Sequence, residues 1–187
     1  MIAVARAGKM ADHKKILVLG IGNDILGDDA VGLIAARELR KTSSDDADFH
    51  ESFGLGLELL DALEGYEFAL ILDSIVTGRN KPGSIIEYTK RDFSEDWPTS
   101  PHYAGIPEVF KIAERLQIPF PNEVRILALE IENPYLIHEG ISEHAERSIP
   151  SFVDRAKKII ISWKNRINNK NPDLLNDRAI HYSVTTD

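Results

Sequence analysis

The sequence contains no cysteine among its 187 residues. This absence excludes disulfide bonds, thiolate metal sites and a cysteine nucleophile, and it fits the reducing environment of the cytoplasm, where we expect the protein to be located. No apolar run approaches the roughly 20 residues that cross a bilayer, so no membrane insertion is expected. The sequence has fewer basic than acidic residues, 22 Lys and Arg compared with 30 Asp and Glu, so the formal net charge is −8. Such a chain repels phosphates, which argues against a nucleic-acid partner.

Several catalytic motifs are also missing. The sequence has neither a Gly-x-Ser-x-Gly nucleophile turn nor a P-loop lysine motif. The segment His138–Ser142 is similar to a helical zinc motif, but Ser142 occupies the position of the second histidine. Gly140 would also lie in the helix interior, where glycine is unfavourable. We therefore interpret this segment as a loop that leads into the last helix.

The length and composition are typical of one globular domain. Hydrophobic residues make up 43% and charged residues 28% of the 187 residues, which is enough for a substantial core. We expect a single catalytic domain over residues 14–167. A loose leader, residues 1–13, precedes it and lacks an apolar core of signal-peptide length, and a polar tail, residues 168–187, follows it.

The segment from Lys14 to Arg40 predicts a strand, a glycine turn, an acidic pair and a helix. Ile16–Leu19 is a short branched apolar run, which is typical of a buried parallel strand. The turn Gly20-Ile21-Gly22-Asn23 and the pair Asp28-Asp29 follow. Apolar residues then recur at helical spacing, with charged residues on the other side. These apolar positions are Val31, Ile34, Ala35 and Leu39.

This segment has two simpler interpretations. A dinucleotide site would need a third glycine where Ile25 stands, and Asp28 and Asp29 would repel a phosphate at the helix N-terminus, so a nucleotide-binding domain is disfavoured. Alternatively, the acidic pair caps the helix, because Asp is a favoured N-cap. Capping accounts best for Asp28 and leaves the role of Asp29 open.

The rest of the chain alternates strands with helices, which predicts an α/β fold whose sheet is largely parallel and covered on both faces. The expected strands are 49–53, 68–72 ending at Asp73, 84–89 and 124–131. The expected helices are a short run between Gly54 and Gly65, one from about Ile106 to Leu116, and one from about Ser142 to Ile167.

Polar side chains follow the strands of this predicted sheet at one edge. Asp29 comes after the first strand, Asp73 ends the Phe68 strand, and His102 precedes a helix. Ligands of parallel sheets bind beyond the carboxyl ends of the strands. Two carboxylates and an imidazole suit a divalent metal such as zinc or nickel, and the same trio could activate a water molecule.

Each of these residues also has a structural alternative. Asp73 could accept hydrogen bonds from loop amides, and His102, which follows Pro101, could cap a helix or pack. Glu130 and Glu132 are weaker candidates, because alternation along a strand should bury one and expose the other.

Several short motifs, taken together in their order along the chain, resemble a known family. They are Gly20-Ile21-Gly22-Asn23 with Asp28-Asp29 and Gly32, then Leu72-Asp73-Ser74-Ile75-Val76, then Pro82-Gly83, and finally Ser100-Pro101-His102. The chain, from about Lys15 to about Trp163, resembles the hydrogenase maturation proteases. These endopeptidases finish the large subunit of nickel–iron hydrogenases.

The resemblance implies a single-domain, three-layer α/β/α sandwich with a largely parallel, mixed-edge central sheet. It also implies removal of a C-terminal extension from a hydrogenase large-subunit precursor by an aspartic-type endopeptidase. Nickel already inserted in that substrate would be the recognition element, so no tightly bound intrinsic cofactor is expected.

The family's metal-contacting positions fall on Asp29, Asp73 and His102, which would be both catalytic and metal-binding. Gly54 and Gly56 would leave room for the substrate peptide to approach the backbone. The alternative function is a non-catalytic accessory or chaperone module that binds the nickel site of the precursor without cutting it.

Overall fold

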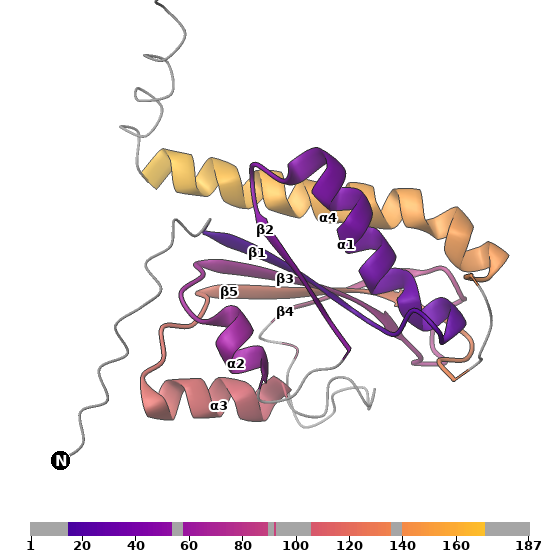
Figure 1. Cartoon of the computed structure of the whole chain (residues 1–187), viewed down its shortest axis with the longest axis horizontal. Helices are drawn as coiled ribbons and strands as arrows, with labels where there is room; N and C mark the ends of the chain where they lie inside the picture. Colours follow the sequence, from indigo (N-terminus) through magenta and orange to yellow (C-terminus); the bar gives the residue numbers. More distant parts are fainter. Residues whose placement is uncertain (1–14, 54–57, 90–91, 93–105, 136–139, 171–187) are drawn as a thin grey trace, which may run out of the picture.

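The central sheet has five strands in the order β2-β1-β3-β5-β4 (Figure 1). The computed structural model describes residues 15–53, 58–89, 92, 106–135 and 140–170. Most neighbouring strands are parallel, whereas β4 runs antiparallel to β5 at one edge. The strands are β1 (Ile16–Ile21), β2 (Asp48–Ser52), β3 (Phe68–Ile75), β4 (Ile85–Thr89) and β5 (Glu123–Glu130). This arrangement confirms the predicted α/β fold with a mixed edge.

Helices cover both faces of the sheet. The 3₁₀ helix η1 (Gly27–Ala30) leads directly into α1 (Val31–Ser43), which shares one face with α4 (Glu143–Lys170). The helices α2 (Glu58–Leu63) and α3 (Ile106–Leu116) lie on the other face. The predicted three-layer sandwich is therefore confirmed. Within the described residues, no helix is both long and apolar enough to cross a bilayer.

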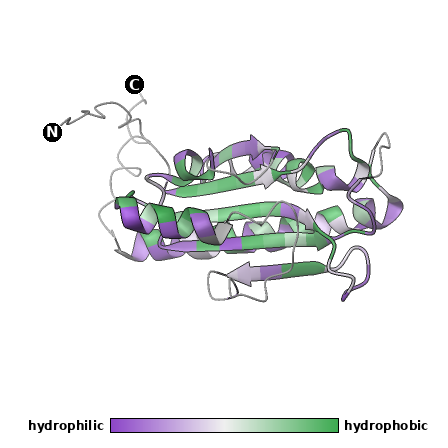
Figure 2. Ribbon diagram, turned by 90° about the horizontal axis from the view of Figure 1, so that it is seen from below, coloured by the Kyte–Doolittle hydropathy of each residue, from purple (hydrophilic) through white to green (hydrophobic). Residues whose placement is uncertain are grey.

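The core consists of two apolar layers separated by the sheet. Along β1, Ile16 and Val18 pack with α1 and α4, whereas Leu17 and Leu19 pack with α2. This alternation follows from the pleat of a strand, and it explains why β1 and β3 are apolar on both faces. Figure 2 shows these strands as predominantly hydrophobic. The largest buried side chain, Trp163 of α4, stacks on Phe68 with ring centroids 5.2 Å apart.

The last helix begins where the sequence predicts and ends slightly later. Ser142 precedes α4 and its Oγ accepts a hydrogen bond of 3.2 Å from the amide of Ala145, which is N-cap geometry. The helix continues through Pro150 and ends at Lys170, beyond the predicted end at Ile167. Its C-terminal half is held to the sheet by polar contacts as well as by Trp163.

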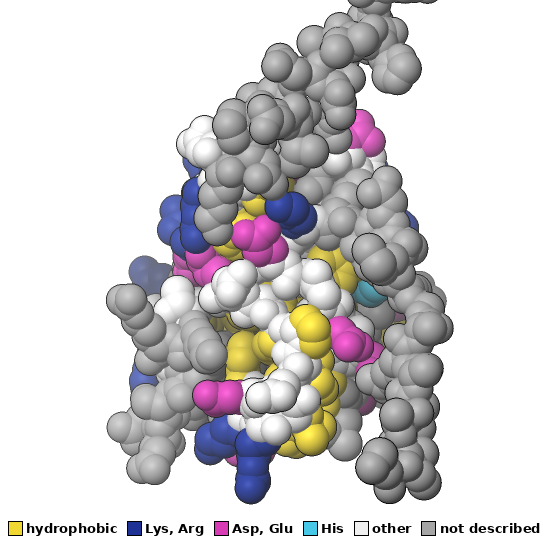
Figure 3. Space-filling model, turned by 90° about the vertical axis from the view of Figure 1, so that its left-hand side faces the viewer, with side chains coloured by type: hydrophobic (Ala, Val, Ile, Leu, Met, Phe, Trp, Pro, Cys, Tyr) yellow, Lys and Arg dark blue, Asp and Glu magenta, His cyan; other side chains and the backbone are white. Residues whose placement is uncertain are grey.

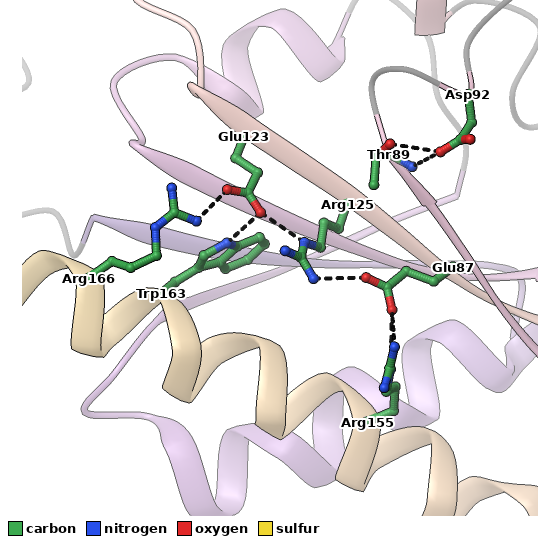
Figure 4. A network of polar contacts seen from close by, with 8 residues as sticks. All are labelled: Glu87, Thr89, Asp92, Glu123, Arg125, Arg155, Trp163 and Arg166. Carbon is green, nitrogen blue, oxygen red and sulfur yellow. Dashed lines mark hydrogen bonds and ion pairs between the residues drawn. The ribbon is translucent and has the colours of Figure 1, made fainter.

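A polar network joins α4 to β5 and β4 (Figure 4). The carboxylate of Glu123 accepts hydrogen bonds from Trp163 Nε1 at 3.0 Å, Arg125 Nε at 2.8 Å and Arg166 at 2.5 Å. Burial raises the pKa of Glu123, but these hydrogen bonds outweigh it and hold the pKa below its ordinary value of 4.5. The charged form of Glu123 is therefore the one that favours the fold.

We expect Glu123→Gln to lower the free energy of unfolding at neutral pH by about 1 kcal/mol, because charge-assisted hydrogen bonds to arginine are lost. Because the pKa of Glu123 is lower in the folded state than its ordinary value of 4.5, its charge stabilises the fold above pH 4.5. This stabilisation is lost as the pH falls through the folded-state pKa. Denaturant unfolding of both proteins at neutral pH and at about pH 3 measures this difference. The difference should shrink at acid pH, and a constant difference would contradict the assigned role of the charge.

Candidate active site

Glycine determines how the chain turns back after β1. Gly22 has φ of +146°, and a Cβ there would lie 2.0 Å from the carbonyl oxygen of Asp29. Only glycine therefore allows η1 to fold against the end of β1. The turn places Asp29 at the carboxyl end of the strand, where its side chain is 2% exposed.

A second glycine brings α1 against the backbone of β3. A Cβ on Gly32 would lie 2.2 Å from the carbonyl oxygen of Ile21, 2.3 Å from that of Leu72 and 2.9 Å from the Cα of Asp73. Since no side chain fits between them, the start of the helix lies directly on the strand. The close approach holds the segment that carries Asp29 beside the segment that carries Asp73.

Ser74 connects the two carboxylates. Its amide donates a hydrogen bond of 2.7 Å to Asp73 Oδ1, and its hydroxyl donates one of 3.0 Å to Asp29 Oδ1. Asp73 is completely buried, with 0% exposure. The structure therefore brings Asp29 and Asp73, which are far apart in the sequence, to a common residue at the carboxyl edge of the central strands.

The predicted end of the Phe68 strand is wrong by a short distance. β3 continues past Asp73 to Ile75, because its backbone stays paired with β5 as far as Ile75 opposite Glu130. Asp73 is nevertheless level with the end of β1, since Leu72 pairs with Gly20. Asp73 therefore lies at the carboxyl edge because the neighbouring strand β1 ends beside it, although β3 itself continues.

Both carboxylates of the predicted site are buried. Two carboxylates near each other in a low-dielectric environment repel, and the pair is stabilised when a cation lies between them. Oxygen ligands of this kind suit a divalent ion. Buried acidic groups beside an edge of the sheet can also accept a proton from a water molecule.

The other predicted site residues, His102, Gly54 and Gly56, lie outside the described residues. Over the ranges that the structure describes, no group of His, Asp or Glu large enough to hold a metal ion is present. The participation of His102 beside Asp29 and Asp73 remains a prediction.

The expected capping role of Asp28 is wrong. The N-cap positions of η1 and α1 are Leu26 and Ala30, and neither helix has a side-chain cap. Asp28 lies inside η1, and its Oδ1 accepts a hydrogen bond of 2.5 Å from the amide of Ser142. Asp28 therefore links the start of α1 to the start of α4.

Glu130 is a buried structural residue beside the site. It is 2% exposed, and its carboxylate accepts hydrogen bonds from the amide of Thr77 at 2.7 Å, from the Thr77 hydroxyl at 2.7 Å and from the amide of Gly78 at 2.8 Å. Glu132 is exposed, but it lies beyond the end of β5, and residues two apart on a strand share a face, so alternation does not account for the difference. Glu130 thus fixes the loop that leaves β3, a role that sequence reasoning missed because its partner Thr77 lies 53 residues earlier in the chain.

Comparison with known proteins gives a consistent result, although no family model matches the chain. The hydrogenase 2 maturation protease of Escherichia coli is 29% identical over 145 residues, which cover 75% of this chain and 87% of that protein. Two solved structures share the fold. The hydrogenase maturating endopeptidase HybD from E. coli is 22% identical with a TM-score of 0.64, and the match covers 79% of this chain and 93% of that one. The [NiFe] hydrogenase maturation protease HybD from Thermococcus kodakarensis is 22% identical with a TM-score of 0.62, and the match covers 78% and 99%.

Proposed function

We propose that this chain is a processing endopeptidase of the same kind as the hydrogenase maturation proteases, which it resembles in sequence and in fold. Its substrate would be the precursor of a nickel–iron hydrogenase large subunit, from which it removes the C-terminal extension after nickel insertion. The observation that carries the proposal is the convergence of Asp29 and Asp73 on Ser74 at the carboxyl edge of the sheet.

In this proposal the nickel belongs to the substrate. The carboxylates of Asp29 and Asp73, together with His102, would bind the nickel that the precursor already carries. Carboxylate oxygens and an imidazole nitrogen are suitable ligands for such an ion. Binding the ion fixes the position of the peptide bond next to it, and positioning of this kind contributes much of the rate of an enzyme reaction.

The chemical step is the addition of water to the scissile carbonyl. The water is polarised by nickel or by a carboxylate, and its oxygen forms the new bond to the carbonyl carbon. The carbon–nitrogen bond then breaks, and the proton from the water reaches the departing amine. The products are the mature C-terminus and the free extension.

The test is co-expression of this chain with a candidate large-subunit precursor, followed by mass measurement of the precursor. A loss of mass that matches the C-terminal extension supports the proposal. A precursor that binds the chain and keeps its full mass would instead support the accessory module that the sequence leaves as the alternative.

Ser74 offers a test of how the two carboxylates are positioned. We expect Ser74→Ala to reduce kcat for the nickel-loaded precursor about tenfold, because Asp29 loses the hydroxyl that orients it while Asp73 keeps the backbone amide. KM should change little, and Ser74→Thr should restore most of kcat because it keeps a hydroxyl. A variant Ser74→Ala with unchanged kcat, or one that Thr does not rescue, would contradict this role.

A further inference from the structure

The exposed large apolar side chains of the described residues are concentrated at one edge of the sheet. Ile25 is 67% exposed, Phe53 79%, Val76 42% and Tyr135 70%. Each lies shortly after the end of a strand. Large apolar side chains that are exposed together commonly mark a surface that contacts another protein.

These residues, which we call the apolar rim, follow adjacent strands. Phe53 follows β2, Ile25 follows β1, Val76 follows β3 and Tyr135 follows β5, and these strands are consecutive in the sheet. Since neighbouring strands are about 4.8 Å apart, the strand ends span roughly 14 Å. The carboxyl ends of the strands lie on the right in Figure 1. The apolar rim follows these strand ends, and Asp29 and Asp73 lie at the same edge.

The turn that carries Ile25 is fixed by hydrogen bonds. Asn23 Oδ1 accepts a bond of 3.2 Å from the Ile25 amide. Arg37 binds both carboxylate oxygens of Asp24, at 2.8 and 2.9 Å, and also binds Glu51 of β2 at 2.6 Å. The hydrogen bonds from Arg37 hold the pKa of Asp24 below its ordinary value, so this contact persists at neutral pH.

The other turns of the apolar rim are fixed in similar ways. The amide of Tyr135 donates a hydrogen bond of 2.9 Å to Asn133 Oδ1. Val76 precedes Thr77, which Glu130 binds through both its amide and its hydroxyl. Next to Phe53, the carbonyl of Ser52 accepts a bond of 3.2 Å from the Gly22 amide.

A rim of this kind is suited to binding, because its apolar side chains stand on turns that are already ordered. Association then costs less conformational entropy, and a few buried aromatic or aliphatic residues can supply most of the binding free energy. A hollow of about 160 Å³ beside Ser52, lined also by His50, Glu58 and Leu59, adds a place where a partner's side chain can enter.

We propose that the apolar rim is the docking surface for an apolar patch of the folded large-subunit precursor beside its cleavage site. This inference rests on the proposed function. The position of the rim identifies the binding partner. If the precursor binds there through a patch beside its cleavage site, its C-terminal region lies close to Asp29 and Asp73. A second copy of this chain on the rim would instead cover the carboxyl edge, and the net charge of −8 disfavours a nucleic acid.

The test compares a rim variant with a matched control in the full chain. The rim variant carries Phe53→Ser and Tyr135→Ser. The control carries Leu116→Ser and Ile161→Ser, because these side chains are 66% and 44% exposed but lie away from the carboxyl edge. Leu116 is the last residue of α3, and the chain then leads into the start of β5. This is the end of the molecule where the strands begin. Figure 3 shows that end, where acidic, basic and apolar side chains are mixed.

We expect the rim variant to raise KM for purified nickel-loaded precursor at least tenfold with kcat within about twofold, and the control to change neither. Adding Asp73→Asn to both proteins allows precursor binding to be measured without cleavage, and the rim variant should weaken Kd by the same factor. Circular dichroism confirms that both variants are folded.

The outcomes separate this inference from the proposed function. If the wild-type chain cuts the precursor but the rim variant has unchanged KM and Kd, the docking surface is wrong and the function stands. If the wild-type chain binds the precursor through the rim but never cuts it, the function is wrong and the docking surface stands. A rim variant that changes only the sedimentation of the free chain would assign the rim to self-association and overturn the inference.

Discussion

Asp73→Asn should abolish processing of the nickel-loaded precursor while the protein remains folded. Loss of a general base or of a charged ligand at a reacting centre typically costs about 10²–10⁴ in rate. Asn retains the volume of Asp73 and an oxygen that accepts the Ser74 amide, but it lacks the charge that would bind nickel or take a proton. The measurement is single-turnover cleavage followed by the mass of the large subunit.

The stability of this variant should be equal to that of the wild type or slightly greater. Asp73 is completely buried, and a buried charge carries a desolvation cost that a neutral Asn of the same size does not. A higher midpoint of thermal unfolding together with lost activity would show that the charge of Asp73 serves the reaction rather than the fold. A large fall in the midpoint would show that Asp73 serves the fold.

Asp28→Asn is the matched control for this experiment. Asp28 lies in the same 3₁₀ turn as Asp29, but its carboxylate accepts the amide of Ser142 at the start of α4. An Asn oxygen accepts the same hydrogen bond, so processing should stay within about threefold of the wild type. Equal defects in Asp28→Asn and Asp73→Asn would mean that the wrong carboxylate was assigned to the reaction.

The layers of the fold could be predicted because they depend on local patterns. Short branched apolar runs such as Ile16–Leu19 predict strands buried on both faces, and the helical spacing after Asp29 predicts the helix that covers them. The alternation of such elements then restricts the topology to a parallel sheet. The direction of the edge strand β4 follows from the short loop that joins it to β3, because a short loop reverses the chain. Its pairing with β5 could not be predicted and is known only from the structure.

The roles of individual polar residues were harder to predict, because their partners are distant in the sequence. Asp28 binds an amide 114 residues away, and nothing in a helix-capping pattern indicates that contact. Glu130 reaches a loop 53 residues earlier, which alternation alone cannot specify.

The contact between Asp29 and Ser74 depends on the way α1 lies directly on β3. Two glycine positions, Gly22 and Gly32, allow that approach. The sequence marked these glycines and both aspartates, but only the structure shows that Ser74 lies between them and that both carboxylates are buried. The apolar rim was missed for a similar reason, since Phe53 and Tyr135 are remote in the chain and come to the same edge of the sheet only through the strand order.

A precursor without nickel should not be cut, even though its peptide sequence is complete. Asp29 and Asp73 are buried and both accept hydrogen bonds from Ser74, and in the proposed function they would bind a cation that offsets their negative charges. The nickel of the precursor would supply that cation and hold the scissile bond near the attacking water. Without it the peptide samples other poses, and the loss of positioning should lower the rate by at least about 10².

The experiment uses purified precursor with and without nickel at matched concentration, and it follows the mass of the large subunit. Both forms should bind the Asp73→Asn protein, because docking on the apolar rim involves apolar contacts, and the nickel-loaded form should bind at least as tightly because Asp29 and His102 can still contact the metal. Binding without cleavage of the nickel-free form would therefore separate docking from the chemical step, and reconstitution with nickel should restore cleavage. Processing would then report that the metal has been inserted. Efficient cleavage of the nickel-free form would show instead that Asp29 and Asp73 act as an ordinary acid–base pair that does not sense the metal.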